Sequence, residues 1–153
     1  LDGDRVVKFR FDPSKNIKFA LIIPDFYLST KKARKIIPET LTVKDAVFNI
    51  SRTALVTAAF LTGNLENLYV GMQDRIHQPY RKGLIPNWDE ITSQAMALGA
   101  KGVFLSGAGP TIIAVLDKDY QRFQREMQQI VDRLNGRWTV EIADICSRGV
   151  QVL

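Results

Sequence analysis

Two apolar runs joined by a short glycine-containing turn constrain the fold of this chain more than any other feature. The runs are residues 102–105 and 112–116, and the turn between them contains Gly107 and Gly109. Apolar runs of this length are typical of strands inside a sheet. Glycines at alternate positions permit positive φ and let another backbone or a ligand approach closely, because they lack Cβ. The segment therefore predicts a tight β-hairpin, and a G-x-G pattern alone is more typical of a plain hairpin turn than of a functional one.

Four further strands are predicted from the hydrophobic pattern. Residues 5–11 alternate between polar and apolar side chains, whereas residues 17–23 are mostly apolar, which is typical of a central strand. Pro24 ends this second strand. Alternation returns over residues 138–142, and residues 150–152 form a last short strand.

Helical periodicity fills the rest of the chain. Ser29 caps a short helix through Lys35, and Thr42 caps a long one that Gly63 ends. The long helix carries a 3.6-residue apolar stripe of Val43, Ala46, Val47, Ile50, Ala54, Ala58 and Leu61, which predicts its buried face. Three later helices are predicted. The first contains the apolar positions Leu65, Leu68, Met72 and Ile76 and ends before Pro79. The second is capped by Asn87 with Glu90 as its reciprocal partner, and the third is capped by Asp117 and ends at Asn135.

Strands and helices interleave in this reading, with adjacent hairpins and no long series of βαβ crossovers. We therefore expect the α+β class, with helices packed on an antiparallel sheet. The chain has 153 residues and a net charge of +5, from 21 basic and 16 acidic side chains. This balance favours an anionic partner without choosing one, and is also common for a solvated surface. No apolar run reaches the roughly 18–20 residues of a membrane helix, no signal peptide is evident, and a cytoplasmic location is expected.

The residues that could carry chemistry are positioning groups rather than an evident catalytic set. His77 is the one histidine and Cys146 the one cysteine, so paired-histidine or cysteine-rich metal sites are not expected. Thr30 and Arg34 lie four residues apart on one helical face, and Arg81 follows Pro79-Tyr80. Two arginines suit the carboxylate of an amino-acid substrate, because a guanidinium can form two parallel hydrogen bonds with it. The alternative is that Arg34 and its neighbouring lysines form a solvated helix face.

Four motifs resemble, in the same order, those of the homoserine kinase branch of the GHMP small-molecule kinases. They are residues 23–34 (IPDFYLSTKKAR), 45–52 (DAVFNISR), 77–81 (HQPYR) and 105–111 (LSGAGPT). The resemblance covers essentially the whole chain but only the C-terminal half of that family. It implies the ferredoxin-like C-terminal domain, with residues 1–24 as trailing strands of a missing N-terminal nucleotide-binding domain and residues 25–153 as the substrate-side domain.

The resemblance also implies roles for particular residues. Thr30, Arg34 and Arg81 would bind L-homoserine. The turn Ser106, Gly107, Ala108 and Gly109 would support the phosphate loop of the missing half, while Asp45, Asn49 and Arg52 are read as a structural polar network. No catalytic base is identified and no metal site is expected in this chain. ATP and Mg²⁺ would serve the intact enzyme, and neither is expected to bind this chain alone.

The reaction implied by the resemblance is transfer of the ATP γ-phosphoryl group to the hydroxyl of homoserine, in threonine biosynthesis. The chain alone is expected to be inactive. Its expected partners are homoserine, the missing half and, in a homodimer, a second copy. One alternative is another GHMP kinase acting on mevalonate or a sugar, and a second is a non-catalytic amino-acid-binding regulatory domain. RNA binding is disfavoured because an RNP-like aromatic strand motif is absent from the sequence, and no membrane partner is expected.

Overall fold

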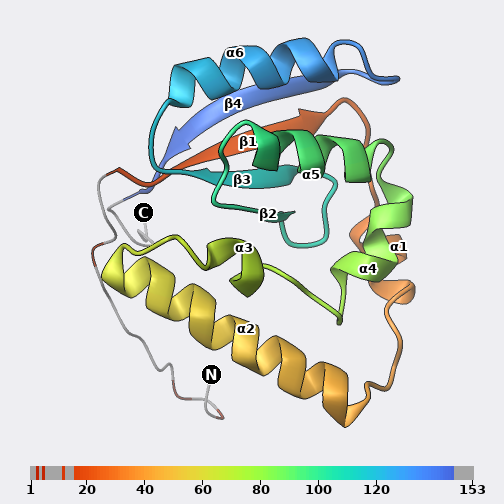
Figure 1. Cartoon of the computed structure of the whole chain (residues 1–153). Coiled ribbons are helices and arrows are strands. Elements are labelled where there is room, and N and C mark those ends of the chain that lie inside the picture. The colour runs from red at the N-terminus through yellow and green to blue at the C-terminus, as the bar shows by residue number, and fades with distance from the viewer. Residues whose placement is uncertain (1–2, 4, 6–11, 13–15, 147–153) are drawn as a thin grey trace.

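The computed structural model describes residues 16–146 together with residues 3, 5 and 12. The elements in chain order are β1 (Lys18–Pro24), α1 (Thr30–Lys35), α2 (Val43–Thr62), α3 (Leu68–Gly71), α4 (Gln78–Arg81), a 3-10 turn (Lys82–Leu84), α5 (Trp88–Ala97), β2 (Gly102–Leu105), β3 (Ile112–Leu116), α6 (Tyr120–Val131) and β4 (Trp138–Asp144) (Figure 1). The strand expected at 150–152, and that at 5–11 apart from Arg5, lie outside the described residues.

The four strands form an antiparallel sheet in the order β2-β3-β1-β4. Ala20 of β1 lies opposite Ala114 of β3 and Ile142 of β4, so β1 is a central strand as its apolar composition predicts. The predicted hairpin is confirmed, because β2 pairs with β3 from Gly102 opposite Val115. Inserting β3 between β1 and β2 produces the split βαβ arrangement, and the predicted α+β class is confirmed.

The position of β1 bears on one expected boundary. Residues 1–24 were expected to end a preceding domain, but Lys18–Pro24 pairs with β3 on one side and β4 on the other. A strand with both edges paired inside this sheet belongs to the same folding unit as its neighbours. This pairing places Lys18–Pro24 in one sheet with β3 and β4.

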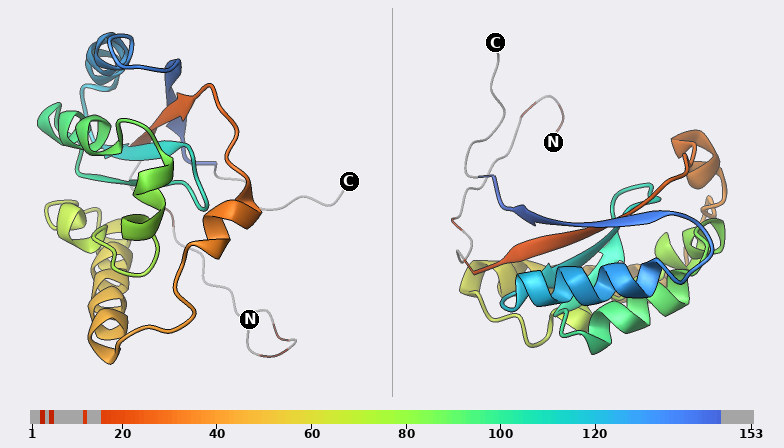
Figure 2. Two further views of the ribbon diagram at one scale, coloured as in Figure 1. Left: turned by 90° about the vertical axis from the view of Figure 1, so that its right-hand side faces the viewer. Right: turned by 90° about the horizontal axis from the view of Figure 1, so that it is seen from above.

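The two faces of the sheet contribute to two separate hydrophobic clusters. On one face Ala20, Ile112 and Leu116 pack with buried residues of α5 and α6, among them Ile91 and Met127. The right-hand view of Figure 2 shows α5 and α6 along this face. On the other face a smaller cluster joins Ala59, Leu65, Leu68 and Val115, with Phe19 and Phe104 at its margin. This second cluster attaches α2 and α3 to the sheet.

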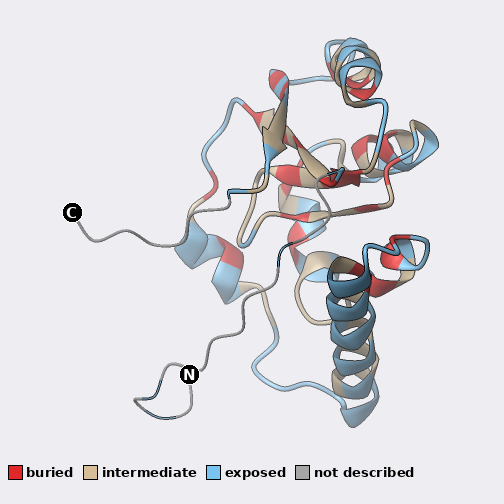
Figure 3. Cartoon of the chain, turned by 90° about the vertical axis from the view of Figure 1, so that its left-hand side faces the viewer, coloured by how far each residue is buried: buried red, intermediate tan, exposed pale blue. Residues whose placement is uncertain are grey.

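The long helix α2 has the predicted ends but a different buried face. Thr42 accepts a hydrogen bond from the Asp45 N–H at the start, and Gly63 ends the helix at φ 75°. Of the apolar stripe, Val43 is 81% and Ile50 is 69% exposed, and Figure 3 shows most of α2 in the exposed colour. The remaining stripe residues are also exposed apart from Ala46, which is half-buried.

Contacts distant in sequence explain this rotation of α2. The face turned toward the rest of the molecule contains Ala59, Val56 and Phe60, which pack in the smaller cluster. A Cβ added to Gly71 of α3 would lie 3.0 Å from Cγ2 of Val56, so the two helices approach closely there. The expectation that the apolar stripe is buried is therefore wrong, because packing against α3 sets the orientation of the helix.

The third predicted helix is much shorter than its apolar spacing indicates. It ends at Gly71, and Pro79 lies in the first turn of α4 rather than ending α3. Proline is accommodated in the first turn of a helix, where its missing N–H has no intrahelical partner to lose. Between the two helices, the Asp74 carboxylate accepts hydrogen bonds from the N–H groups of Ile76, His77 and Gln78. These bonds take the place of helix continuation.

Two predicted helix caps do not form. Asn87 precedes α5 at φ 60° without a side-chain cap, and its amide instead donates to the Asn135 carbonyl. Asp117 does not cap α6, which Asp119 precedes; its carboxylate pairs with Lys101 at 3.2 Å. The Asn87 and Asp117 side chains, which the local sequence pattern predicts to be helix caps, therefore bind partners elsewhere in the sequence instead.

Glutamines of α6 cover the outer edge of β4. Gln128 donates to the Trp138 carbonyl at 2.9 Å and accepts from the Val140 N–H at 2.8 Å. Gln124 donates to the Val140 carbonyl at 2.9 Å. An edge strand presents unpaired N–H and C=O groups that can recruit another chain. The amide of Gln128 binds two of these groups as a neighbouring strand would.

Candidate functional site

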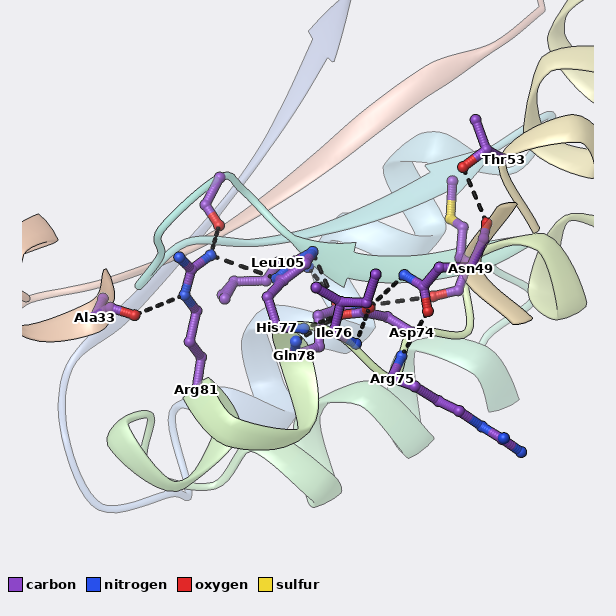
Figure 4. A network of polar contacts seen from close by, with 12 residues as sticks. Ala33, Asn49, Thr53, Asp74, Arg75, Ile76, His77, Gln78, Arg81 and Leu105 are labelled. Carbon is purple, nitrogen blue, oxygen red and sulfur yellow. Dashed lines mark hydrogen bonds and ion pairs between the residues drawn. The ribbon is translucent and has the colours of Figure 1, made fainter. Parts of the chain in front are cut away.

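Arg81 connects three elements that are far apart in the sequence. It is only 8% exposed, which is uncommon for a charged side chain unless it has partners. Its Nε donates to the Ala33 carbonyl in α1 and its Nη1 to the Gly107 carbonyl in the β2–β3 turn, each at 2.9 Å. Nη1 also lies 3.4 Å from Nδ1 of His77 (Figure 4). These contacts fix the guanidinium between α1 and the turn.

The short helix α1 presents the exposed part of the predicted site. Ser29 caps it by accepting from the Lys32 N–H, as expected, and Ala33 is fully buried. Thr30 and Arg34 are exposed, one turn apart. Within the described residues, the Arg34 side chain has no hydrogen bond or ion pair, whereas Arg81 bonds the carbonyl of the preceding residue. The structure thus brings Arg81 to the backbone beside Arg34 and leaves the Arg34 side chain open to solvent.

The glycine turn has the backbone geometry expected from its sequence. Gly107 and Gly109 have φ of 55° and 84°, in the region that favours glycine. The Ser106 N–H donates to the Thr111 carbonyl and the Gly109 N–H to the Ser106 carbonyl, so the turn is closed on itself. The turn is partly exposed, including Ala108. Its Gly107 carbonyl points to Arg81, which links the predicted turn to the predicted arginine.

A buried carboxylate, Asp74, organises the segment that leads into α4. Its side chain is 6% exposed. Four groups donate to it: the Asn49 side-chain amide and the backbone N–H groups of Ile76, His77 and Gln78. Burial alone raises the pKa of Asp74, but these four hydrogen bonds outweigh it and hold the pKa below its ordinary value. Asp74 is therefore ionised at neutral pH.

His77 lies between this carboxylate and Arg81. Its Nε2 is 3.3 Å from Oδ2 of Asp74 and its Nδ1 is 3.4 Å from Nη1 of Arg81. Burial lowers the pKa of His77; the charge of Asp74 opposes this effect and that of Arg81 adds to it, leaving the pKa below the ordinary value. A neutral imidazole is the form expected near pH 7.

The three polar residues predicted on α2 lie against the segment around Asp74. Asn49 donates to Asp74 at 2.7 Å and accepts from the Arg75 N–H at 3.0 Å. Asp45 pairs with Arg75 at 3.4 Å. The guanidinium carbon of Arg52 lies 3.6 Å from the ring centre of Phe48. The Nε of Arg52 is buried and has no hydrogen-bond partner in the described structure. Arg52 and His77 both line a cavity of about 310 Å³. Asp45 and Asn49 therefore make contacts within the protein.

Sequence reasoning missed two residues of this region. Asp74 was not singled out, and Gln78 was read only as part of a motif. Gln78 accepts from the Leu105 N–H at 2.8 Å, so it binds the free edge of β2. The sequence signal for Asp74 is an acidic side chain four residues before the start of α4, where such a side chain can accept hydrogen bonds from nearby backbone N–H groups in a turn. Such a signal indicates a turn but not the partners in α2 and α4.

Comparison with known proteins identifies the family of this chain. The sequence model described as "GHMP kinases C terminal" matches residues 56–133, about half of the chain. This chain belongs to the GHMP kinases. The resemblance noted in its motifs is confirmed, and the match is to the C-terminal domain of the family.

Curated GHMP kinase relatives align along almost all of this chain. A homoserine kinase of Petrotoga mobilis is 45% identical over 98% of this chain and 49% of the relative. That of Caldicellulosiruptor saccharolyticus is 44% identical over 99% of this chain and 50% of the relative. The crystal structure of homoserine kinase from Cytophaga hutchinsonii superposes with a TM-score of 0.83 at 27% identity, covering 90% of this chain and 44% of that one. The chain spans about half the length of the curated relatives it matches.

The described part of this GHMP kinase chain offers no metal centre. Within residues 16–146 and the three isolated described positions, no group of three or more His, Cys, Asp or Glu side chains is arranged to hold a metal ion. Among the helices described, none combines the length and apolar character needed to span a bilayer.

Proposed function

We propose that this chain is the substrate-side part of a homoserine kinase, which transfers the γ-phosphoryl group of ATP to the hydroxyl of L-homoserine. Relatives at 44–45% identity carry that name along almost the whole of this chain. The observation that carries the proposal is the connection of the basic helix α1 to the glycine turn through Arg81. This connection joins a substrate-binding motif to a turn that resembles the phosphate-loop support of the family.

Arg34 and Arg81 have different roles in this proposal. Arg34 is exposed and available to bind the homoserine carboxylate, with Thr30 one turn earlier on the same face. Arg81 has already used Nε and Nη1 on backbone carbonyls, so only its Nη2 remains for a substrate oxygen. Arg81 thereby holds α1 in place, and only the two N–H groups of Nη2 are left for the substrate. This division modifies the symmetric two-arginine clamp expected from the sequence.

Phosphoryl transfer depends mainly on position and charge. The hydroxyl oxygen of homoserine forms a bond to the γ-phosphorus and gives up its proton, the bond from that phosphorus to the β–γ bridging oxygen breaks, and ADP and the proton leave. The contribution of this chain is to hold the amino-acid end so that the hydroxyl lies in line with that bond. We assign ATP and Mg²⁺ binding to the half of the full-length protein that this chain lacks, and no catalytic base to this half.

Steady-state kinetics of the full-length protein test this proposal. We expect phosphorylation of L-homoserine in preference to mevalonate and to sugars. Arg34→Ala should raise KM for homoserine about 10- to 150-fold, because a charged hydrogen bond contributes about 1.5–3 kcal/mol, while KM for ATP stays unchanged. A variant that impairs ATP binding instead contradicts the assignment. Calorimetry on the 153-residue chain should show negligible ATP binding and at best weak homoserine binding, whereas tight homoserine binding by this chain alone would favour the amino-acid-binding regulatory domain.

A further inference from the structure

Asp74, His77 and Arg81 form a continuous chain of polar contacts that ends at the glycine turn. The first contact joins Oδ2 of Asp74 to Nε2 of His77 at 3.3 Å. The second joins Nδ1 of His77 to Nη1 of Arg81 at 3.4 Å, and the third joins the same Nη1 to the Gly107 carbonyl at 2.9 Å. Figure 4 shows the three side chains in this order, and Asn49 lies on the side of Asp74 away from Arg81.

The chemistry of the two flanking groups allows only one neutral form of His77. An ionised carboxylate can only accept a hydrogen bond, and a guanidinium can only donate one. A neutral imidazole donates from one ring nitrogen and accepts at the other. Arg81 can donate to Nδ1 only when that nitrogen carries a lone pair, so the proton of the neutral ring is on Nε2, which lies 3.3 Å from the Asp74 carboxylate. Asp74 thus favours the tautomer that can accept from the arginine.

Asp74 is itself held rigidly enough to do this. Asn49 of α2 and the backbone N–H of Ile76 bind its Oδ1, each at 2.7 Å. The N–H groups of His77 and Gln78 bind Oδ2. A carboxylate with donors on both oxygens cannot rotate without losing several of them, and its low exposure excludes most water. The orientation of the imidazole follows from that of the carboxylate.

We propose that Asp74 and His77 are positioning residues for Arg81, and through it for α1 and the glycine turn. This inference rests on the proposed function, because it concerns how the substrate-side arginine is oriented. His77 completes the set of acceptors around Arg81, together with the carbonyls of Ala33 and Gly107. With both ring nitrogens occupied, His77 does not serve as a base that takes the proton of the substrate hydroxyl.

Paired substitutions of His77 in the full-length protein test the proposal. His77→Phe keeps a ring of similar size but removes both polar contacts, whereas His77→Asn keeps an acceptor near the position of Nδ1. We expect His77→Phe to raise KM for L-homoserine about tenfold, the usual order for one hydrogen bond to a charged group, with KM for ATP unchanged. His77→Asn should recover most of the affinity. Gln128→Ala, on the far edge of the sheet, is the control for destabilisation alone.

Three results would overturn the positioning role. One is an unchanged KM for homoserine in His77→Phe. Another is equal impairment of the Phe and Asn variants together with lowered melting temperatures, which a merely structural role produces. The third is an ¹⁵N spectrum in which His77, assigned by its loss in His77→Phe, carries its proton on Nδ1. The expected spectrum has the proton on Nε2.

Failure of the proposed function gives a different pattern. In that case the wild-type protein does not phosphorylate homoserine, or Arg34→Ala leaves KM for homoserine unchanged. The ¹⁵N spectrum still decides the inference then, because the tautomer of His77 does not depend on which substrate is bound. A proton on Nε2 in the wild type supports the inference, because Nδ1 is then free to accept from Arg81, whereas a proton on Nδ1 contradicts it.

Discussion

The side chain of Arg81 donates a hydrogen bond of 2.9 Å to the carbonyl of Gly107, 26 residues further along the chain. The same guanidinium binds the Ala33 carbonyl, 48 residues earlier. Loss of this side chain leaves two carbonyls without their charged donor and separates α1 from the turn. The geometry of the candidate site therefore depends on one buried arginine.

Replacement of Arg81 should therefore affect both stability and substrate binding. Arg81→Lys keeps the charge, but a lysine cannot reproduce the planar fork that reaches both carbonyls. We expect a loss of about 2 kcal/mol in the free energy of unfolding and a raised KM for homoserine in the full-length protein. Arg34→Lys, at an exposed position, should raise KM without a measurable change in stability. Urea unfolding and steady-state kinetics on both variants check this contrast, and equal destabilisation of the two contradicts it.

Asp74 should be among the most sensitive polar positions for stability. Asp74→Ala removes the acceptor of three backbone N–H groups and of Asn49, leaving buried donors unsatisfied. The expected cost is about 3 kcal/mol in the free energy of unfolding. Asp144→Ala is the matched control, because its carboxylate is 76% exposed and pairs only with Lys18; an exposed pair contributes about 0–1 kcal/mol. Similar losses in the two variants would show that the Asp74 hydrogen bonds contribute little.

The pH dependence of stability should have one sign for both titrating groups. The pKa of Asp74 lies below its ordinary 3.8 and that of His77 below its ordinary 6.5. In each case the unfolded chain binds the proton more readily, so stability falls as the pH falls. The stabilisation linked to His77 is fully present above pH 6.5 and is lost as the pH falls through the lower pKa of the folded state. The stabilisation linked to Asp74 is fully present above pH 3.8 and is lost in the same way at lower pH.

Urea unfolding over a pH series measures this dependence. His77→Phe should remove the part of the decline that begins near 6.5 while leaving the decline in the acid range below 3.8. A wild-type protein whose stability rises on acidification through this range would contradict both assignments.

The two glycines of the turn should differ in their tolerance of alanine. Both have positive φ, which costs a residue with a Cβ about 1–2 kcal/mol. A Cβ at Gly109 would also lie 3.0 Å from Cδ1 of Leu105, whereas a Cβ at Gly107 meets nothing within 4 Å. Gly109→Ala should therefore destabilise the protein more than Gly107→Ala. Thermal unfolding of the pair provides the comparison, and the reverse order would contradict the packing described for Gly109.

The glutamine cover of β4 should protect the sheet edge. Gln128→Ala removes the amide that binds the Trp138 carbonyl and the Val140 N–H. We expect a loss of about 1–2 kcal/mol and a greater tendency to self-associate through the open edge. Gln129→Ala, at an exposed neighbouring position, is the control. Unfolding curves and light scattering at increasing concentration distinguish the two, and identical behaviour would show that the edge needs no cover.

Several features could be read from the sequence because their causes are local. The caps at Ser29 and Thr42, the stop at Gly63 and the hairpin turn each depend on residues within a few positions of one another. The candidate residues Thr30, Arg34 and Arg81 came from motif resemblance, which does not describe how a side chain is used. Nothing in the 77–81 motif indicates that Nε and Nη1 of Arg81 donate hydrogen bonds to backbone carbonyls.

The sequence by itself determined the strand and helix types, the antiparallel α+β class and the family. Each of these depends on periodicity, turn chemistry or motifs, which are properties of residues close together in the sequence. Only the tertiary structure decided which face of α2 is buried, where β1 belongs, and how Asp74 and His77 bear on Arg81. These outcomes depend on contacts between elements that are separate in the sequence, such as those of Asn49 with Asp74 and of Arg81 with Ala33. Close packing and the need to satisfy buried polar groups select among such contacts, and a local pattern cannot express that selection.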